Sequence, residues 1–323
     1  MKITFCNHDT QSRESPLIER AARPIVTVVI PTRNRPALVL RAVKSALDQT
    51  LTDLEVIVVV DGPDLKTVDV LANVSDPRLR TISLPHSVGG SDARNIGVQA
   101  GSGEFVALLD DDDEWFAYKL SAQLAAARAS KDAFPVITSR LIARRPDGDE
   151  IWPHRPMRAG ESMSEYLFCR ENSFRQGEGF IQSSTLFLPR ELMLRVPFQS
   201  GLPRHQDWDW LIRADAYPGV KIVALWETLV IYHIDARRKS ISAGRAACPS
   251  MDWVNSNRLV TQKARAYFFA TQVAVRCGSL RTFAQIIGNT IKYPRACLIG
   301  MGLALTPRGL VSHLRAGKVA AHA

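Results

Sequence analysis

Four consecutive aspartates and a glutamate, Asp110 to Glu114, stand directly after the apolar run Phe105–Leu109. Neighbouring carboxylates raise one another's pKa, so a confined group of this kind needs cations to balance it. Hard oxygen ligands suit Mg²⁺ or Mn²⁺, which keep positions open for substrate phosphates. A solvated acidic loop is the alternative. The apolar run before the acids and Trp115 after them favour a metal site.

Two further polar clusters follow apolar runs in the same way. Pro31–Arg35 comes after Ile25–Ile30, and Asp61–Asp64 comes after Val56–Val60. A further cation, Arg94, lies shortly before the third apolar run. If the three runs are neighbouring strands, their polar ends meet at one edge of a sheet, which is where open α/β sheets bind ligands.

The elements between these clusters support that arrangement. The apolar runs are rich in β-branched residues and lack polar alternation, as expected of parallel strands buried on both faces. Helical spacing predicts helices over 35–50 and 65–73 and from about residue 91 to the Gly101-Ser102-Gly103 breaker. The pattern predicts a doubly wound α/β domain with a parallel sheet. No GxGxxG or GxxxxGK[ST] follows the first strand, so we assign phosphate binding to a metal.

A second acidic position stands far along the chain, in the segment His205-Gln206-Asp207-Trp208-Asp209-Trp210. The segment opens a predicted helix, and Asp207 is our candidate for a general base that removes a proton from a substrate hydroxyl. The alternative makes Asp207 an N-cap or first-turn acid stabilised by the helix dipole. Asp209 is the weaker candidate for the base.

Four segments together give the chain a family resemblance over about residues 25–245. They read VVIPTRNR, EVIVVVDGPD, GGSDARNIGVQAGSGEFVALLDDDDEW and RHQDWDWLIR. In this order and spacing they resemble the family 2 glycosyltransferases of the GT-A fold, which transfer sugars from nucleotide-sugar donors. The resemblance implies a mainly parallel central sheet flanked by helices, followed here by a C-terminal helical extension.

The resemblance also implies roles for individual residues. It implies that the nucleotide-sugar donor is bound by the residues Pro31, Thr32, Arg33, Arg35, Asp61, Arg94, Asp110 and Asp111. It matches Asp110 and Asp112 to the family's DxD motif, with Asp112 the direct ligand of Mg²⁺ or Mn²⁺ and Asp113 behind it. Asp207 is then the catalytic base, and His233 stands where some relatives place an extra metal ligand or phosphate contact.

Two positions depart from the common pattern of the family. Many members have two acids before the glycine of the second motif, but Val60 fills the first position. Asp61 alone must therefore recognise the nucleobase of the donor. The late motif is often Glu-Asp, whereas this chain has Gln206-Asp207. Because the aspartate is retained, the chemistry expected of this motif is retained as well.

The charge of the chain is distributed unevenly. The whole sequence carries 41 Lys and Arg against 32 Asp and Glu, but residues 253–323 hold ten basic and no acidic residues. This shift in composition marks a domain boundary near residue 252. Together with the resemblance it predicts an N-terminal extension over 1–24, a glycosyltransferase domain over 25–250 and a basic helical extension over 251–323. Basic segments seek anionic partners, so we expect the extension to contact an anionic membrane surface.

The remaining expectations concern compartment and partners. Five widely spaced cysteines without a CxxC pair indicate a reducing compartment. No signal peptide or spanning helix is apparent, which predicts a cytoplasmic enzyme, peripheral at the inner face of the cell membrane. The expected partners are a nucleotide-sugar donor and a glycan or lipid-linked acceptor of cell-surface polysaccharide or glycolipid synthesis, and no nucleic acid. The alternatives are a nucleotidyltransferase and a non-catalytic nucleic-acid-binding protein that uses the basic tail.

Overall fold

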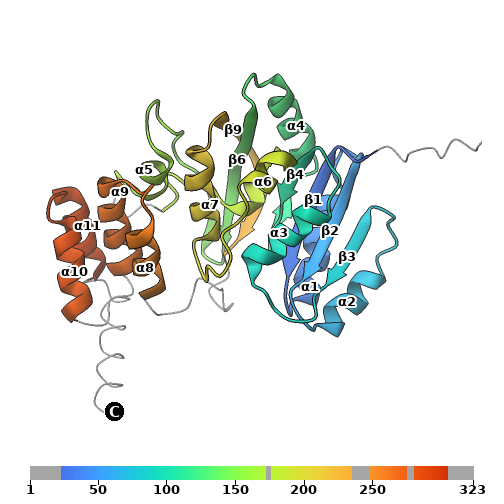
Figure 1. The fold of residues 1–323 in the computed structure, drawn as a ribbon, viewed down its shortest axis with the longest axis horizontal. Helices are drawn as coiled ribbons and strands as arrows, with labels where there is room; N and C mark the ends of the chain where they lie inside the picture. Colours follow the sequence, from blue (N-terminus) through green and yellow to red (C-terminus); the bar gives the residue numbers. More distant parts are fainter. Residues whose placement is uncertain (1–22, 172–175, 235–247, 275–279, 305–323) are drawn as a thin grey trace, which may run out of the picture.

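The N-terminal half of the sheet is parallel. The computed structural model describes residues 23–171, 176–234, 248–274 and 280–304. Strands in the order β3-β2-β1-β4 pair in parallel and alternate with helices along the chain (Figure 1). The elements are β1 (Val26–Thr32), α1 (Pro36–Leu47), β2 (Leu54–Val60), α2 (Leu65–Ala72), β3 (Leu79–Ser83), α3 (Gly90–Ala100) and β4 (Phe105–Leu108).

β1, β2 and β4 are buried on both faces, as their continuous apolar runs predicted. Val28 and Val58 pack with Val39 of α1, on one face of the sheet. The next residue of β1, Val29, packs with Val98 of α3 on the other face. This alternation places a helix on each side, and the carboxyl ends of the strands are left facing the loops that carry the polar clusters.

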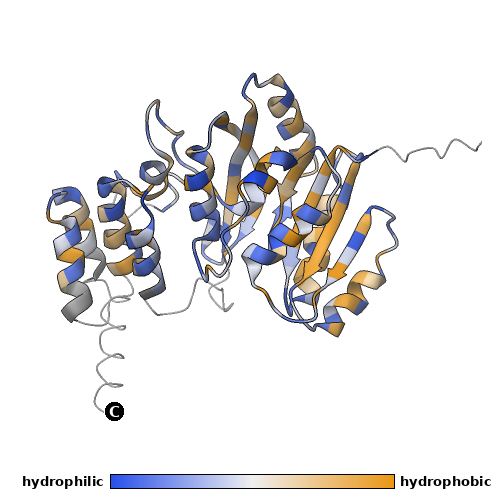
Figure 2. Cartoon of the chain, viewed as in Figure 1, coloured by the Kyte–Doolittle hydropathy of each residue, from blue (hydrophilic) through white to orange (hydrophobic). Residues whose placement is uncertain are grey.

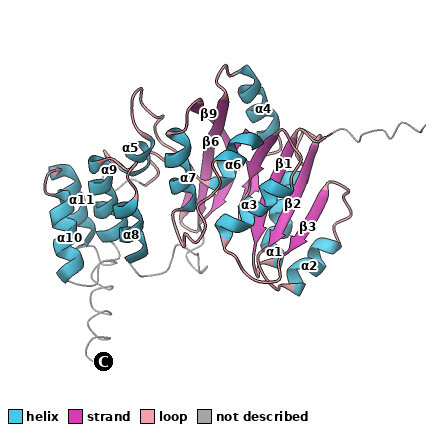
Figure 3. Cartoon of the chain, viewed as in Figure 1, coloured by secondary structure: helices cyan, strands magenta, loops and turns pink. Residues whose placement is uncertain are grey.

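The second half of the sheet is mixed. β8 pairs antiparallel with both β4 and β6, β6 pairs in parallel with β9, and short β5 adds antiparallel to β9. Figure 3 shows the strands as one continuous layer with helices around it. The elements are β5 (Glu114–Trp115), α4 (Lys119–Ala129), β6 (Phe134–Arg145), β7 (Gly148–Trp152), α5 (Met163–Phe168), η1 (Ser183–Thr185), β8 (Phe187–Pro189), α6 (Arg190–Arg195), α7 (Gln206–Asp215) and β9 (Val220–His233).

The C-terminal part is a helical group at one end of the molecule, beside α5 and α7 (Figure 1). Polar and apolar residues alternate around its helices (Figure 2). Buried Val254 and Phe268 belong to the same hydrophobic core as Trp210 of α7, so the group is packed onto the sheet domain. No helix among the described residues is long and apolar enough to cross a membrane. The elements are α8 (Cys248–Ser256), α9 (Gln262–Phe268), η3 (Phe269–Val273), α10 (Leu280–Thr290) and α11 (Pro294–Ala304).

The α/β fold, the three buried strands and the helices between them are confirmed. Pro36 occupies the first turn of α1, as its fixed φ favours. The described residues of the C-terminal extension are helical, also as predicted. The predicted N-terminal extension lies outside the described residues except for its last two. The sequence did not reveal β3, an edge strand whose burial is only partial.

Candidate active site

The ends of β1 and β4 are joined by direct hydrogen bonds. Thr32 Oγ1 donates to Asp111 Oδ2 at 2.7 Å. Arg35 Nη1 lies 2.8 Å from Asp111 Oδ1 and 3.1 Å from Asp112 Oδ2. The first and third polar clusters therefore form one surface, in which a guanidinium balances part of the acidic run.

The four aspartates divide into an accessible pair and a buried pair. The side chains of Asp110 and Asp112 are each 25% exposed, whereas Asp111 is 7% exposed and Asp113 is fully buried. Burial raises the pKa of Asp111, which Arg35 opposes, and burial with the charge of Asp112 raises the pKa of Asp113 well above its usual value. The accessible pair is the one that a divalent cation can reach.

Gln182 and Ser184, in the segment before β8, form hydrogen bonds with the acidic run. Ser184 Oγ donates to Asp113 Oδ2 at 2.7 Å and accepts from the main-chain N of Asp110 at 3.0 Å. Gln182 Nε2 donates to Asp110 Oδ2 at 2.8 Å and to Asp113 Oδ2 at 2.9 Å. Gln182 and Ser184 were not among the predicted site residues. No local pattern in the sequence reveals their contacts with acids about 70 positions earlier in the chain.

Asp61 organises the loop that leads into α3. Its carboxylate accepts from Ser87 Oγ at 2.8 Å, from Val88 N at 2.6 Å and from Gly89 N at 3.1 Å. Gly89 has a φ of +90°, which a side chain would strain, and this conformation ends the loop at the start of α3. Arg33 Nη1 also donates to Ser87 Oγ, so the ends of β1 and β2 meet at this loop.

Arg94 connects the acidic run to the late motif. Its Nη2 donates to Asp110 Oδ1 at 2.5 Å, and its Nη1 donates to Gln206 Oε1 at 2.9 Å. The side chain is only 10% exposed. The guanidinium of Arg94 thus lies between the end of β4 and Gln206, the first residue of α7. Gln206 is 112 positions after Arg94 in the sequence.

Asp207 lies in the first turn of α7 and is partly buried. Burial and the negative charge of Asp110 raise its pKa to about 6, while Arg94 acts in the opposite direction. The N-cap position belongs to His205, so the N-cap interpretation of Asp207 is wrong, although it is a first-turn acid. Asp209 bonds instead to Arg213 and to Trp253 Nε1. The raised pKa of Asp207 suits a base that works near neutral pH.

His233 is tied to the acidic run by two hydrogen bonds. Its ring Nε2 lies 2.6 Å from Glu114 Oε1, and its main-chain N donates to Asp113 Oδ1. Burial lowers the pKa of this imidazole. No three His, Cys, Asp or Glu side chains of the described ranges come together as a ready metal site. In proteins Mg²⁺ is usually held by one or two carboxylates and completed by substrate phosphates.

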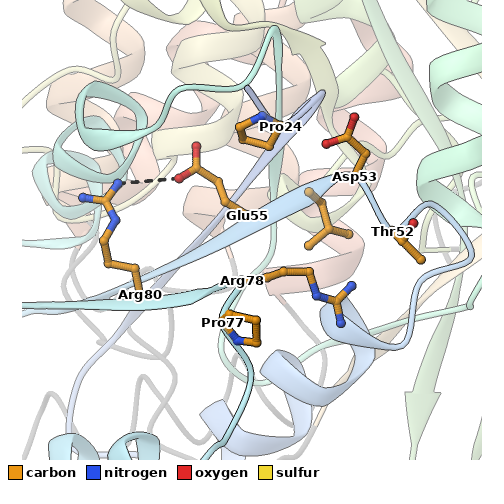
Figure 4. Close-up of a pocket in the computed structure, with 8 residues that line it drawn as sticks. Pro24, Thr52, Asp53, Glu55, Pro77, Arg78 and Arg80 are labelled. Atoms are coloured by element: carbon orange, nitrogen blue, oxygen red, sulfur yellow. Dashed lines mark ion pairs between the residues drawn. The ribbon is translucent and has the colours of Figure 1, made fainter. Parts of the chain in front are cut away.

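A separate hollow lies at the amino ends of β1, β2 and β3, opposite the ends that carry the polar clusters (Figure 4). Both of its arginines form ion pairs: Arg78 with Asp76, and Arg80 with Glu55 at 3.6 Å. It contains none of the predicted site residues. The hollow is lined by Pro24, Thr52, Asp53, Leu54, Glu55, Pro77, Arg78 and Arg80.

Comparison with known proteins identifies the family. The sequence model described as Glycosyl transferase family 2 matches residues 27–194, more than half of the chain. The chain belongs to this family. It is also 30% identical to the amylovoran biosynthesis glycosyltransferase AmsB of Erwinia amylovora over 240 residues, which cover 71% of this chain and 76% of the relative.

Other relatives match over shorter stretches. The UDP-Glc:alpha-D-GlcNAc-diphosphoundecaprenol beta-1,3-glucosyltransferase WfaP of Escherichia coli is 30% identical over 110 residues, covering 34% of this chain and 44% of the relative. The chain is therefore a glycosyltransferase whose relatives include enzymes of polysaccharide and lipid-linked glycan synthesis.

Solved structures confirm the GT-A fold of this family 2 glycosyltransferase. S. aureus TarS in complex with UDP-GlcNAc has a TM-score of 0.54 at 16% identity, over 92% of this chain and 91% of that one. The mannosyltransferase PcManGT of Pyrobaculum calidifontis, in complex with GDP-Man and Mn²⁺, has a TM-score of 0.54 at 17% identity, over 92% and 85% of the two chains. At these identities the likeness shows the fold alone.

Proposed function

We propose that this glycosyltransferase moves a sugar from a nucleoside diphosphate to a hydroxyl of a growing polysaccharide or lipid-linked glycan, with inversion at the anomeric carbon. The observation that supports it most directly is the position of Arg94 between Asp110 and Gln206. This contact brings the acidic run beside the helix that carries Asp207. A donor bound at the acidic run would therefore face Asp207, the proposed base.

In the proposed reaction the acceptor oxygen attacks the anomeric carbon on the face opposite the diphosphate. A carbon–oxygen bond to the acceptor forms, the bond to the diphosphate oxygen breaks, and the hydroxyl proton passes to Asp207. With a pKa of about 6, Asp207 is ionised at neutral pH and can take this proton. Arg94 lies where it can balance the charge that develops on the leaving diphosphate.

The donor site is built on the ends of the parallel strands. We assign the nucleotide to the surface around Pro31, Thr32 and Asp61, and the phosphates to Arg33, Arg35 and Arg94. Asp111 supports this surface through Thr32 and Arg35. The buried carboxylate of Asp61 is occupied by the loop before α3, so it acts on the nucleotide chiefly by fixing that loop.

Asp112 and Asp110 would hold Mg²⁺ or Mn²⁺, because they are the accessible pair of the acidic run. The metal would act as a Lewis acid toward the diphosphate. Mn²⁺ accompanies GDP-Man in the mannosyltransferase of similar fold. The bond of His233 to Glu114 favours a supporting role for this histidine over direct metal ligation.

The C-terminal helices offer a surface suited to an anionic membrane, where a lipid-linked acceptor would lie. Ile291, Leu298 and Met301 are 65%, 66% and 39% exposed. Lys292 and Arg295 are exposed beside them. We call these five residues the α11 surface. Apolar side chains with adjacent cations match the interfacial region of a bilayer, and we propose a peripheral position at the inner face of the cell membrane.

The proposed function is tested by donor binding and turnover. The purified chain is screened by thermal shift against UDP-glucose, UDP-GlcNAc and GDP-mannose, with and without Mn²⁺. A donor at 100 times its Kd should add about 2.7 kcal/mol of stability. The best donor is then incubated with a GlcNAc-diphospholipid acceptor, and release of nucleoside diphosphate is measured. Binding that needs the metal and turnover that needs the acceptor are expected; stabilisation by none of the donors contradicts the proposal.

A further inference from the structure

His205 stands immediately before α7 in a backbone conformation that is uncommon for residues other than glycine. Its φ is +62° and its ψ is 25°, in the left-handed region. Among the described residues, only Asn34 shares a positive φ without being glycine. A residue other than glycine keeps a left-handed backbone conformation only when its surroundings hold it in place. Such residues concentrate at functional sites. The main-chain O of His205 accepts from Asp209 N at 2.8 Å, so this conformation sets the first turn of α7.

The surroundings that hold His205 come mostly from the C-terminal helices. Its ring stacks on Trp208 at 4.8 Å with an angle of 8° between the planes. On its other sides lie Trp253 of α8 at 5.1 Å and Phe268 of α9 at 5.3 Å between ring centroids. Its Nε2 lies 2.8 Å from Oγ of the fully buried Ser250, also on α8.

A second contact from α8 holds the other side of Asp207. Trp253 Nε1 donates to Asp209 Oδ1 at 3.0 Å, and Asp209 Oδ2 pairs with Arg213 one turn along α7. The C-terminal helices therefore contact the residues two positions before and two positions after Asp207. The ring of Trp208, the residue next to Asp207, packs at 6.4 Å against Phe268 as well.

From these contacts we infer that His205 is a positioning residue for the transfer reaction: held by α8 and α9, it fixes the start of α7 and thereby the place of the Asp207 carboxylate. The inference rests on the proposed role of Asp207 as the base. It gives the C-terminal helices a part in catalysis that is separate from any contact of the α11 surface with a membrane. Because proton transfer depends steeply on geometry, a small displacement of Asp207 reduces turnover more than it reduces donor binding.

The test uses the full chain with UDP-glucose, UDP-GlcNAc or GDP-mannose, whichever the thermal-shift screen selects, and Mn²⁺. His205→Gly removes the ring and tolerates the left-handed backbone, while His205→Asn tolerates that backbone and retains a polar side chain. Both are expected to lower kcat 10-fold or more, with the donor KM and the Kd of the nucleoside diphosphate changed less than twofold. In an Asp207→Asn background, His205→Gly should cause little further loss, because His205 acts through Asp207.

Ile299→Ala is the matched control for general loosening. Ile299 is 4% exposed in α11 and belongs to the same core. It should lower the Tm without the loss of kcat at temperatures below that Tm. Normal kcat in both His205 variants, or an equal loss in Ile299→Ala, overturns the positioning role. An Asp207→Asn enzyme that keeps normal turnover instead contradicts the proposed base, which separates the two failures.

Discussion

Arg94 and Asp110 form an ion pair at 2.5 Å, and the second terminal nitrogen of the same guanidinium holds Gln206 at 2.9 Å. One cation therefore neutralises part of the acidic run and fixes the first residue of α7. Its charge also lowers the pKa of Asp207, against the effects of burial and of Asp110. In the proposed reaction a donor diphosphate that approaches Arg94 competes with Asp110 for it, which would couple donor binding to the ionisation of Asp207.

This coupling predicts a shift in pH dependence on removal of the charge. In Arg94→Gln the pKa of Asp207 rises above its value of about 6, because the stabilising cation is lost. The acidic limb of the kcat/KM profile should move to higher pH, and the donor KM should rise. Arg94→Lys retains the charge and is the control: its acidic limb should stay near that of the wild type. Identical profiles for the two variants would show that Arg94 does not act on the base through its charge.

Asp207→Asn should abolish most transfer and leave donor binding intact. General-base catalysis contributes about 10²–10⁴-fold, so a kcat loss of that order is expected. In the wild type, kcat/KM should rise with pH through about 6 and level off above it, since the ionised carboxylate is the active form. Asp215→Asn, at the last residue of α7, is the control and should turn over normally. Wild-type activity in Asp207→Asn would move the base elsewhere.

The same substitution should change stability in a pH-dependent way. The folded-state pKa of Asp207 lies above its ordinary value of 3.8, so folding favours the protonated form. As the pH rises from about 4 to beyond 6, ionisation of Asp207 lowers the free energy of unfolding. Asp207→Asn removes this penalty. Its Tm should exceed that of the wild type at pH 8 and equal it at pH 4, measured without donor; a lower Tm at pH 8 would contradict the pKa direction.

Asp112→Asn should remove metal-dependent donor binding while the fold is retained. Asp112 is an accessible carboxylate at the end of β4, and its loss takes away the anionic oxygen that a hard divalent cation prefers. Calorimetry with nucleoside diphosphate and Mn²⁺ measures the effect. Asp149→Asn on β7, where Asp149 forms an exposed ion pair with Arg144 of β6, is the control. If Asp112→Asn binds the diphosphate with the same metal dependence as the wild type, Asp112 is not a ligand.

The sequence was sufficient for the parts of the molecule that local patterns determine. Uninterrupted β-branched runs predicted β1, β2 and β4, and the polar residues after them predicted the edge at which Thr32 and Asp111 are joined. The alternation of accessible and buried side chains within the acidic run is not visible in four identical letters. Asp113 is bound by Ser184 and Gln182 from a segment about 70 residues away, and Asp111 is bound by Thr32 and Arg35.

Contacts between distant segments explain what the sequence did not predict. The composition of the tail indicated a basic surface, but nothing local showed that Ser250 and Trp253 would hold His205, 45 or more positions earlier. The same holds for Asp209, which the sequence offered as an alternative base. Its bonds to Arg213 and Trp253 give it a structural part instead. Pairings of this kind are settled by tertiary packing, which periodicity does not encode.

The α11 surface predicts binding to anionic membranes. Each cation near the surface contributes about 1 kcal/mol, so Lys292→Ala with Arg295→Ala should weaken binding by about 2 kcal/mol, or roughly 30-fold at low salt. Adding Leu298→Ser removes an apolar side chain of α11 that is 66% exposed and should weaken binding further. Flotation with vesicles of phosphatidylglycerol, compared with phosphatidylcholine, measures the effect. Wild-type binding should require the anionic lipid and decline as salt screens the charges.

The control for this prediction lies on α2, in the sheet domain. Leu65 is 78% exposed and Lys66 is exposed beside it, so Leu65→Ser with Lys66→Ala removes a similar apolar and basic pair. This variant should float with anionic vesicles like the wild type, because α2 lies far from α11 along the molecule (Figure 1). If both sets of substitutions weaken binding equally, net charge alone attracts the protein to the lipid. If neither does, the α11 surface does not bind membranes.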